Sequence, residues 1–258
     1  MRRFLIVIVA VAAVLVFGIT EAVHVWALRS YRGVSPICRV QTALPEVAVS
    51  FDDGPDEDYT PLVLRELTAT HSTATFFVTG EHASSLPGLV DAIIASGNEL
   101  GDHTWSHPDL TSLDEAEAFA EFARTADLLS SESVRLVRAP HGEISAATLR
   151  HLRAAGFVPI GWSVPLDHYI EGLGLSPHAA ATTIARTVKP GDIVLAHDAD
   201  DGEIDRHAAM ETIELLLPLL RERGISVVSV GTLLDDGSPV LATPRPWFWQ
   251  SGFSCPAR

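Results

Sequence analysis

Residues 46–78 read EVAVSFDDGPDEDYTPLVLRELTATHSTATFFV, and this stretch decides the fold. It holds a β-rich run at Val47–Phe51, a helix-compatible stretch at Pro61–Thr68 and a second β-rich run at Thr75–Val78. Pro61 stands near the start of the predicted helix, where a missing backbone N–H is tolerated. Strand, helix and strand in this order form a βαβ unit, which predicts two parallel strands in one sheet.

The alternation of strand and helix continues to residue 230. Five further strands are predicted, at Glu99–Leu100, Val134–Val137, Val158–Val164, Ile193–Ala196 and Ile225–Val230. Five further helices are predicted, at Pro87–Ser96, Leu113–Leu129, Ser145–Ala155, Pro177–Val188 and Arg206–Arg223. The whole pattern predicts an α/β fold of mainly parallel strands, either closed as a barrel or open and doubly wound.

The amino terminus carries the clearest local signal. Arg2 and Arg3 precede an uncharged run from Phe4 to Thr20, which can extend through Leu28. Because this run has no polar face, a buried helix of the domain is disfavoured. We expect residues 1–28 to form a hydrophobic helix that acts as a signal anchor, and a cleaved signal peptide is the alternative. Both place the rest of the chain outside the cell membrane, anchored or secreted.

Three predicted segments follow. Residues 29–45 contain two prolines and no periodicity, so we expect a linker between anchor and domain. We expect residues 46–237 to form the folded domain and residues 238–258 to form an extension that packs across it or returns to Cys38. Cys38 and Cys255 are the two cysteines, and they either form one disulfide in an oxidising compartment or remain free thiols.

Length and charge limit the classes of function. The 258 residues suit one domain, and the apolar fraction of 47% is that of a packed globular chain. The formal net charge of −15 would repel a nucleic-acid phosphate backbone. Nucleic acid is therefore excluded as a partner, and we expect a monomer.

The first chemical feature is a pair of acids at a strand end. Asp52 and Asp53 precede a Gly-Pro turn, a setting that an ordinary solvated turn also provides. His103 and His107 are four residues apart, so on a helical turn their imidazoles would point from one face. With Asp53 they would supply the ligands of a catalytic zinc site that keeps one position open for water. The same ligand set also suits non-haem iron.

Two further groups stand at the ends of later predicted strands. Arg138, Pro140 and His141 follow one strand, and Leu195 and His197 lie at the end of another. Singly, Arg138 suits a surface ion pair and His197 a core or capping position. Because the carboxyl ends of parallel strands share one face, the groups together predict an active site there.

The order of these motifs resembles that of the polysaccharide deacetylases, the carbohydrate esterase family 4 that shares the chitooligosaccharide-deacetylase homology domain. That family carries the motifs T-F-D-D-G-P, H-[ST]-x-x-H, R-x-P-[YF]-G, D-W and L-x-H in this order. The chain reads SFDDGP at 50–55, HTWSH at 103–107, RAPHG at 138–142, DHY at 167–169 and LAH at 195–197. The resemblance covers about residues 46–234.

The resemblance implies a distorted (β/α)7-type barrel and a divalent metal held by Asp53, His103 and His107. The implied metal is most often Zn²⁺, with Co²⁺ or Mn²⁺ as alternatives. Metal-bound water would be the nucleophile and Asp52 the general base, oriented by Arg138.

The resemblance also implies the acid and the substrate contacts. His197 would be the general acid, with a pKa tuned by Asp167. Pro140 and Leu195 would line the pocket for the acetyl group, and the backbone N–H of His141 would bind the oxyanion.

Two positions depart from the family pattern near the substrate pocket. His141 stands where the family has Tyr or Phe, and His168 stands where it has the Trp of the D-W motif. The segment before Asp167 is also shorter than usual. We expect His168 to be a supplementary polar contact to substrate or a solvated loop residue.

The leading hypothesis is hydrolysis of N-acetyl groups on peptidoglycan or a chitin-like glycan, with peptidoglycan as the first choice. An O-acetyl esterase acting on xylan or a surface polysaccharide would use the same site. A non-catalytic carbohydrate-binding relative and an iron oxygenase are the competing classes. The oxygenase is disfavoured because, by analogy, those sites occur on antiparallel double-sheet folds, whereas this chain alternates strand and helix.

Overall fold

The computed structural model describes residues 29–129, 134–199, 205–244 and 253–256. The hydrophobic helix predicted at residues 1–28 therefore lies outside the described residues. Within the described ranges, every helix is too short or too polar to cross a membrane.

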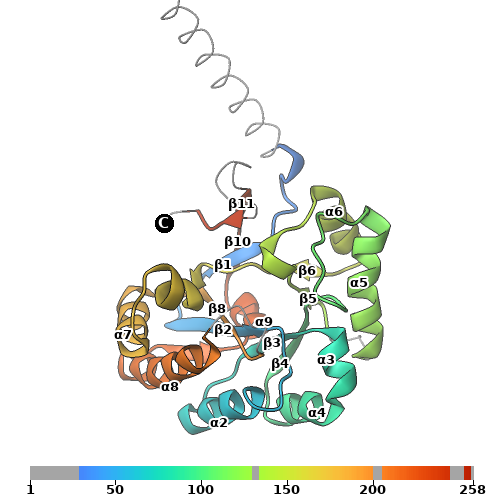
Figure 1. Ribbon diagram of the computed structural model, residues 1–258. Helices are drawn as coiled ribbons and strands as arrows, with labels where there is room; N and C mark the ends of the chain where they lie inside the picture. The colour runs from blue at the N-terminus through green and yellow to red at the C-terminus, as the bar shows by residue number, and fades with distance from the viewer. Residues whose placement is uncertain (1–28, 130–133, 200–204, 245–252, 257–258) are drawn as a thin grey trace, which may run out of the picture.

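The centre of the fold is a parallel sheet with helices around its outside (Figure 1). Its strands are β2 (Glu46–Asp52), β3 (Thr75–Val78), β4 (Glu99–Asp102), β5 (Leu136–Val137), β6 (Val158–Pro159), β7 (Val164–Pro165), β8 (Ile193–His197) and β9 (Ser226–Val228). The strand order is β6-β5-β4-β3-β2-β8-β7, and β9 pairs with the amino-terminal half of β2. This arrangement fits an α/β barrel, which is one of the two folds that the alternation of strands and helices allows and the one that the family resemblance implies.

The sheet departs from the prediction at residues 158–164. The sequence predicts one strand there, but the structure has two short strands, β6 and β7, at opposite ends of the strand order. Between them Gly161 donates its N–H to the carbonyl of Ile37 and accepts a hydrogen bond from Arg138 through its own carbonyl. The backbone therefore leaves the sheet to cross the gap between its two ends.

Strand β1 (Ile37–Gln41) fills this gap. It forms single bridges from Ile37 to Ile160 and from Arg39 to Asp192, and it pairs antiparallel with β10 (Ser238–Leu241). Part of the segment expected to be a linker is thus packed on the domain, since Cys38 is 1% exposed. A second small pair joins β11 (Thr243–Pro244) to β12 (Phe253–Ser254).

The helices surround the sheet (Figure 1). They are α2 (Thr60–Thr70), α3 (Gly80–Ser85), α4 (Pro87–Ala95), α5 (Glu115–Leu128), α6 (Ala146–Ala154), α7 (Pro177–Thr187), α8 (Arg206–Glu222) and α9 (Val230–Asp235). All six predicted helices are present. The two that were not predicted, α3 and α9, have six residues each, which is too short for a helical period to stand out.

Alternate side chains of β2 pack on opposite faces, which fixes the register that carries the site. Val49 and Phe51 belong to the main core under the helices, whereas Ala48 packs with Ile193 on the other face. Both faces are buried, as expected for a parallel strand covered by helices. The last residue of this strand, Asp52, therefore has a fixed orientation.

A disulfide joins Cys38 in β1 to Cys255 near the carboxyl terminus across a sequence separation of 217. It fastens the two ends of the described chain to each other beside the gap in the sheet. Closing so long a loop restricts the unfolded chain.

We expect the double variant Cys38→Ala, Cys255→Ala to lose about 3–5 kcal/mol of unfolding free energy, because the unfolded chain regains this freedom. Thermal unfolding would show a fall in Tm of about 10 °C. Wild type under reducing conditions is the matched control and should unfold at the same temperature as the double variant. Equal Tm values for oxidised wild type and variant would show that the bond adds nothing to stability.

Candidate active site and metal centre

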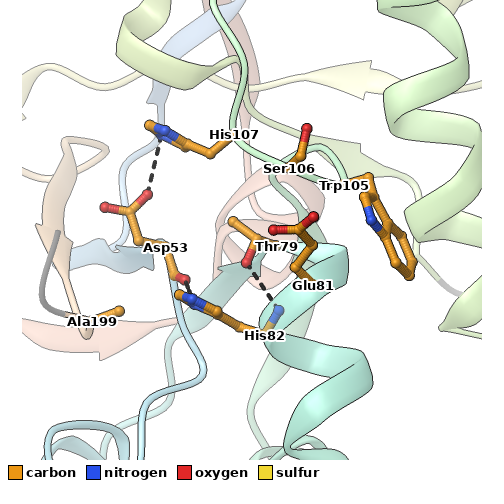
Figure 2. A pocket seen from close by; sticks show the side chains of 8 residues that line it. All are labelled: Asp53, Thr79, Glu81, His82, Trp105, Ser106, His107 and Ala199. Carbon is orange, nitrogen blue, oxygen red and sulfur yellow. Dashed lines mark hydrogen bonds and ion pairs between the residues drawn. The ribbon is translucent and has the colours of Figure 1, made fainter.

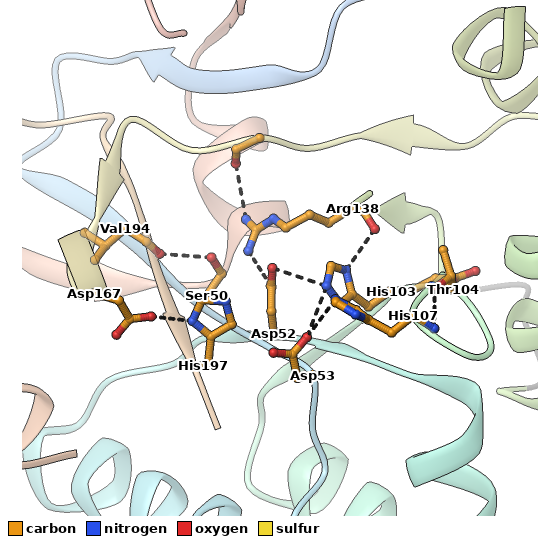
Figure 3. Close-up of polar contacts among 12 residues, drawn as sticks. Ser50, Asp52, Asp53, His103, Thr104, His107, Arg138, Asp167, Val194 and His197 are labelled. Carbon is orange, nitrogen blue, oxygen red and sulfur yellow. Dashed lines mark hydrogen bonds and ion pairs between the residues drawn. The ribbon is translucent and has the colours of Figure 1, made fainter. Parts of the chain in front are cut away.

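The polar residues gather where the parallel strands end (Figure 3). Asp52 is the last residue of β2 and lies opposite His197, the last residue of β8. His103 directly follows β4 and Arg138 directly follows β5. The shared strand direction thus brings together residues that are up to 145 positions apart, as 197 − 52 shows.

Asp53, His103 and His107 converge on one point. Oδ1 of Asp53 lies 3.3 Å from Nε2 of His103 and 3.3 Å from Nε2 of His107. One ligand atom from each residue lies within 4.8 Å of the others. The buried Oδ1 of Asp53 has no hydrogen-bond partner among the described residues, which is a costly state that a cation would relieve. These three residues fit a divalent metal ion.

The contacts of the three ligands direct them toward one another. Nδ1–H of His103 donates to the carbonyl of Arg138 at 2.9 Å, which directs Nε2 toward Asp53. Burial lowers the pKa of His103, but the charges of Asp52 and Asp53 outweigh burial and raise it. Burial and the charge of His103 lower the pKa of His107 to about 4, so its imidazole is neutral. Burial raises the pKa of Asp53, but the imidazoles of His103, His197 and His107 beside it outweigh burial and bring that pKa below its ordinary range.

The histidines reach the site from a loop, which corrects the expectation of a helical turn. Residues 103–107 have no helical structure, and Thr104 and His107 have φ values of 71° and 54°. The carboxylate of Glu121 in α5 accepts hydrogen bonds from the backbone N–H groups of Trp105 and Ser106. Anchoring by a neighbouring helix, rather than helical spacing, therefore sets the direction of His107.

Asp52 forms a buried ion pair beside the metal group. Nη1 of Arg138 donates to Oδ1 of Asp52 at 2.6 Å, and the other oxygen of Asp52 lies 3.7 Å from Nε2 of His103. The Arg138 guanidinium stacks over the Phe77 ring at 4.0 Å and donates to the carbonyl of Gly161 at 3.2 Å. This pair keeps a carboxylate next to the metal ligands and fixes its orientation.

His197 and Asp167 form a second pair on the opposite side of Asp52 (Figure 3). Nδ1–H of His197 donates to Oδ2 of Asp167 at 2.5 Å, which leaves Nε2 as the atom that can exchange a proton. Burial lowers the pKa of His197, but the hydrogen bond and charge of Asp167, with the charges of Asp52 and Asp53, raise it to about 8. His197 is therefore a cationic proton donor at neutral pH.

The predicted substrate contacts differ in burial and in their distance from the metal ligands. Pro140 and Leu195 are buried, and the His141 ring stands exposed with its centroid 4.9 Å from that of His107. His168 is exposed, and its ring packs against Tyr169 and close to the backbone of Gly172. The structure thus brings His141 to the rim of the metal group, whereas the contacts of His168 are with its own turn, η2 (His168–Gly172).

A cleft of about 210 Å³ opens beside Asp53 and His107 (Figure 2). Its lining residues are Asp53, Thr79, Glu81, His82, Trp105, Ser106, His107 and Ala199. His82 was not predicted, yet its Nδ1–H donates to the carbonyl of Asp53 at 2.7 Å. His82 lies in α3, a helix too short to be predicted, so only its position after β3 could have suggested a role for it.

Asp198 and Arg206 were also missed. Asp198 is fully buried against Thr60, which donates to its Oδ2 at 2.6 Å, and burial raises its pKa to about 7. Arg206 lies 3.8 Å from Asp167. Neither residue belongs to a local motif that would have distinguished it from a helix cap or a surface charge.

The chain is similar to known proteins over a region that includes the candidate metal ligands and Arg138. A family model described as polysaccharide deacetylase matches residues 39–160. A chitooligosaccharide deacetylase from Sinorhizobium fredii is 34% identical over 204 residues, which are 74% of this chain and 93% of that protein. A peptidoglycan-N-acetylglucosamine deacetylase from Bacillus cereus is 29% identical over 193 residues, covering 74% of this chain and 68% of that protein.

Solved structures show the same similarity. The Bc1960 peptidoglycan N-acetylglucosamine deacetylase superposes with a TM-score of 0.71 at 27% identity, over 79% of this chain and 95% of that one. A family 4 carbohydrate esterase from Streptomyces lividans gives a TM-score of 0.62 at 25% identity, over 72% and 93% of the two chains.

Proposed function

Because the chain belongs to the polysaccharide deacetylase family, we propose that it hydrolyses N-acetyl groups on the N-acetylhexosamine units of an extracellular glycan. One observation carries the proposal: the candidate metal ligands Asp53, His103 and His107 lie next to a buried carboxylate, Asp52, and in the same site as a cationic imidazole, His197. A base and an acid beside an electrophilic centre are what amide hydrolysis needs.

We propose that Asp53, His103 and His107 hold a divalent ion, with Zn²⁺ as the first choice and Co²⁺ or Mn²⁺ as alternatives. Such an ion, when bound, polarises a carbonyl group and makes water more acidic. Asp52 accepts the proton of the attacking water, and its ion pair with Arg138 orients it for that step. The backbone N–H of His141 and the side chains of Pro140 and Leu195 surround the acetyl group.

His197 completes the reaction as the acid. An amine anion is too poor a leaving group to depart unprotonated, so the nitrogen of the sugar must receive a proton as the C–N bond breaks. The Nε2–H of His197 supplies it, and Asp167 stabilises the charged imidazole beforehand. A raised pKa at this position favours an amide substrate over an ester, because an ester alcohol departs more readily without full protonation.

Peptidoglycan is the substrate that we propose first. The solved relative with a TM-score of 0.71 is a peptidoglycan N-acetylglucosamine deacetylase, and a chitin-like oligomer is the other glycan suggested by the relatives. An apolar run after two arginines at the amino terminus supports a position outside the cell membrane, and the disulfide suits an oxidising compartment.

The pH dependence of kcat/KM should report the acid. Because the pKa of His197 is raised to about 8, the protonated form dominates at neutral pH and is lost as the pH rises through this value. We expect activity to decline above about pH 8, and Asp167→Asn to move the decline to lower pH because the imidazolium loses its counter-charge. A variant profile that coincides with that of wild type would contradict this assignment.

The function is tested by acetate release from purified peptidoglycan, chitooligosaccharides and acetylated xylan, each with and without a chelator. We expect chelator-sensitive release from the N-acetylated glycans. Release from xylan alone would show an O-acetyl esterase. The absence of release from all three substrates by metal-loaded protein would show a non-catalytic carbohydrate-binding relative.

A further inference from the structure

Arg206 is a buried cation that the mechanism above leaves without a role. It is the first residue of α8, and its side chain is 1% exposed. Burying a guanidinium costs free energy that a nearby anion must offset. The position therefore calls for an explanation in terms of the charge that it faces.

Among the described residues, Arg206 approaches the carboxylate that is the partner of the proposed acid. Its Nη1 lies 3.8 Å from Oδ2 of Asp167, and this same oxygen accepts the Nδ1–H of His197 at 2.5 Å. Asp167 is itself 11% exposed. One carboxylate oxygen is thus held between an imidazole and a guanidinium, largely away from water.

The backbone around Arg206 is tied to the segment that carries Asp167. The side chain of Asp205 caps α8 by accepting the N–H of Ala208, and the N–H of Asp205 donates to Oε1 of Glu171. Glu171 lies in η2, which begins one residue after Asp167. The start of α8 and the turn that holds Asp167 are therefore connected directly.

A guanidinium also lies beside Asp52, the proposed general base, at the shorter distance of 2.6 Å. There, Arg138 is fully buried and pairs with Asp52. Here, Arg206 is fully buried and faces Asp167. Each of the two carboxylates that serve the proposed proton transfers thus has one guanidinium beside it.

From this geometry we propose that Arg206 is a positioning residue for the acid: it keeps the carboxylate of Asp167 directed at Nδ1 of His197. The inference rests on the proposed function, because it assigns Arg206 to the acid of that reaction. Without the guanidinium, the nearly buried carboxylate of Asp167 turns toward water. His197 then loses its partner, and its ring is no longer oriented.

The charges around His197 decide the sign of the effect. Asp167 faces it from the turn after β7, and Asp52 and Asp53 face it from β2. Arg206 approaches from α8 through Asp167. If Arg206 acted only through its field, removal of this cation would raise the pKa of His197. If Arg206 holds Asp167 in place, its removal lowers that pKa.

The test compares Arg206→Met and Arg206→Lys with Arg221→Met, a matched control at an exposed position of the same helix. Two substrates are used: an N-acetylated chitooligosaccharide, whose amine must be protonated, and 4-nitrophenyl acetate, whose phenolate departs unaided. We expect Arg206→Met to lower kcat about 10–100-fold on the amide and less than about threefold on the ester. The pKa that governs the alkaline decline of kcat in Arg206→Met should be lower than in wild type by about one unit.

Arg206→Lys retains a cation without the planar guanidinium. Its kcat on the amide should fall about threefold more than its kcat on the ester, which keeps the test valid if the Met variant does not fold. Equal losses on both substrates, or an alkaline pKa that is unchanged or raised, would overturn the inference. The His197 imidazole pKa, measured by NMR in wild type and variant, tests Arg206 even if wild type deacetylates no glycan. A wild type that deacetylates no glycan would refute the proposed function but not the role of Arg206.

Discussion

Asp53→Ala is expected to abolish deacetylation, with a loss of at least about 1,000-fold in acetate release from N-acetylated oligomers. The buried Oδ1 of Asp53 stands 3.3 Å from the Nε2 atoms of both His103 and His107, so its removal leaves two imidazoles of the candidate ligand set without its carboxylate. The bound metal per chain, measured by atomic emission after dialysis, should fall from about one to nearly zero.

The matched control for this variant is Asp58→Ala, an exposed acid in the same loop after β2. It should retain both metal and activity. Full metal content with intact acetate release in Asp53→Ala would show that Asp53 is not a ligand. The reaction would then have no reason to be placed at this end of the sheet.

Asp52→Asn is expected to lower kcat by about 100- to 10,000-fold while the metal content stays at about one per chain. The amide keeps the shape of the side chain but cannot accept the proton of water. The same change leaves the buried Arg138 without a counter-charge, so unfolding free energy should also fall, by about 3–5 kcal/mol. Acetate release, metal analysis and denaturant unfolding measure the three quantities separately.

Asp58→Asn makes the corresponding change in charge at an exposed position and serves as the control. The important result is the difference between the two variants. Asp53→Ala should lose both catalysis and metal, whereas Asp52→Asn should lose catalysis and keep its metal. If Asp52→Asn also lost the metal, Asp52 would be a ligand, and the proposed base would have to be sought elsewhere.

The fold could be predicted from sequence where periodicity and strand ends carry the information. The acids of SFDDGP and the histidine of LAH stand at the ends of adjacent parallel strands, β2 and β8, as the alternation of strands and helices predicts. Seven strands were predicted where the parallel sheet has eight, because residues 158–164 are split by the crossing at Gly161. That split depends on the Ile37 carbonyl, which is more than 120 residues away in sequence, as 161 − 37 shows.

The site could be predicted where a motif identified its residues, but local spacing gave the wrong geometry at HTWSH. The spacing of His103 and His107 suggests a helical turn, yet the pair lies on a loop that Glu121 anchors from α5. Arg206 could not be found from sequence, since a basic residue at the start of a helix has no signal of its own. Its position becomes meaningful only when the fold brings it to Asp167.

The most direct test of the account is anomalous diffraction at the zinc edge from crystals of the protein loaded with Zn²⁺. We predict one strong peak at the end of β2 and β4, about 2.0–2.2 Å from a carboxylate oxygen of Asp53 and from Nε2 of His103 and His107. A zinc peak that lies elsewhere, or one that His103 and His107 bind without Asp53, would contradict the central claim that these three side chains form a single metal centre.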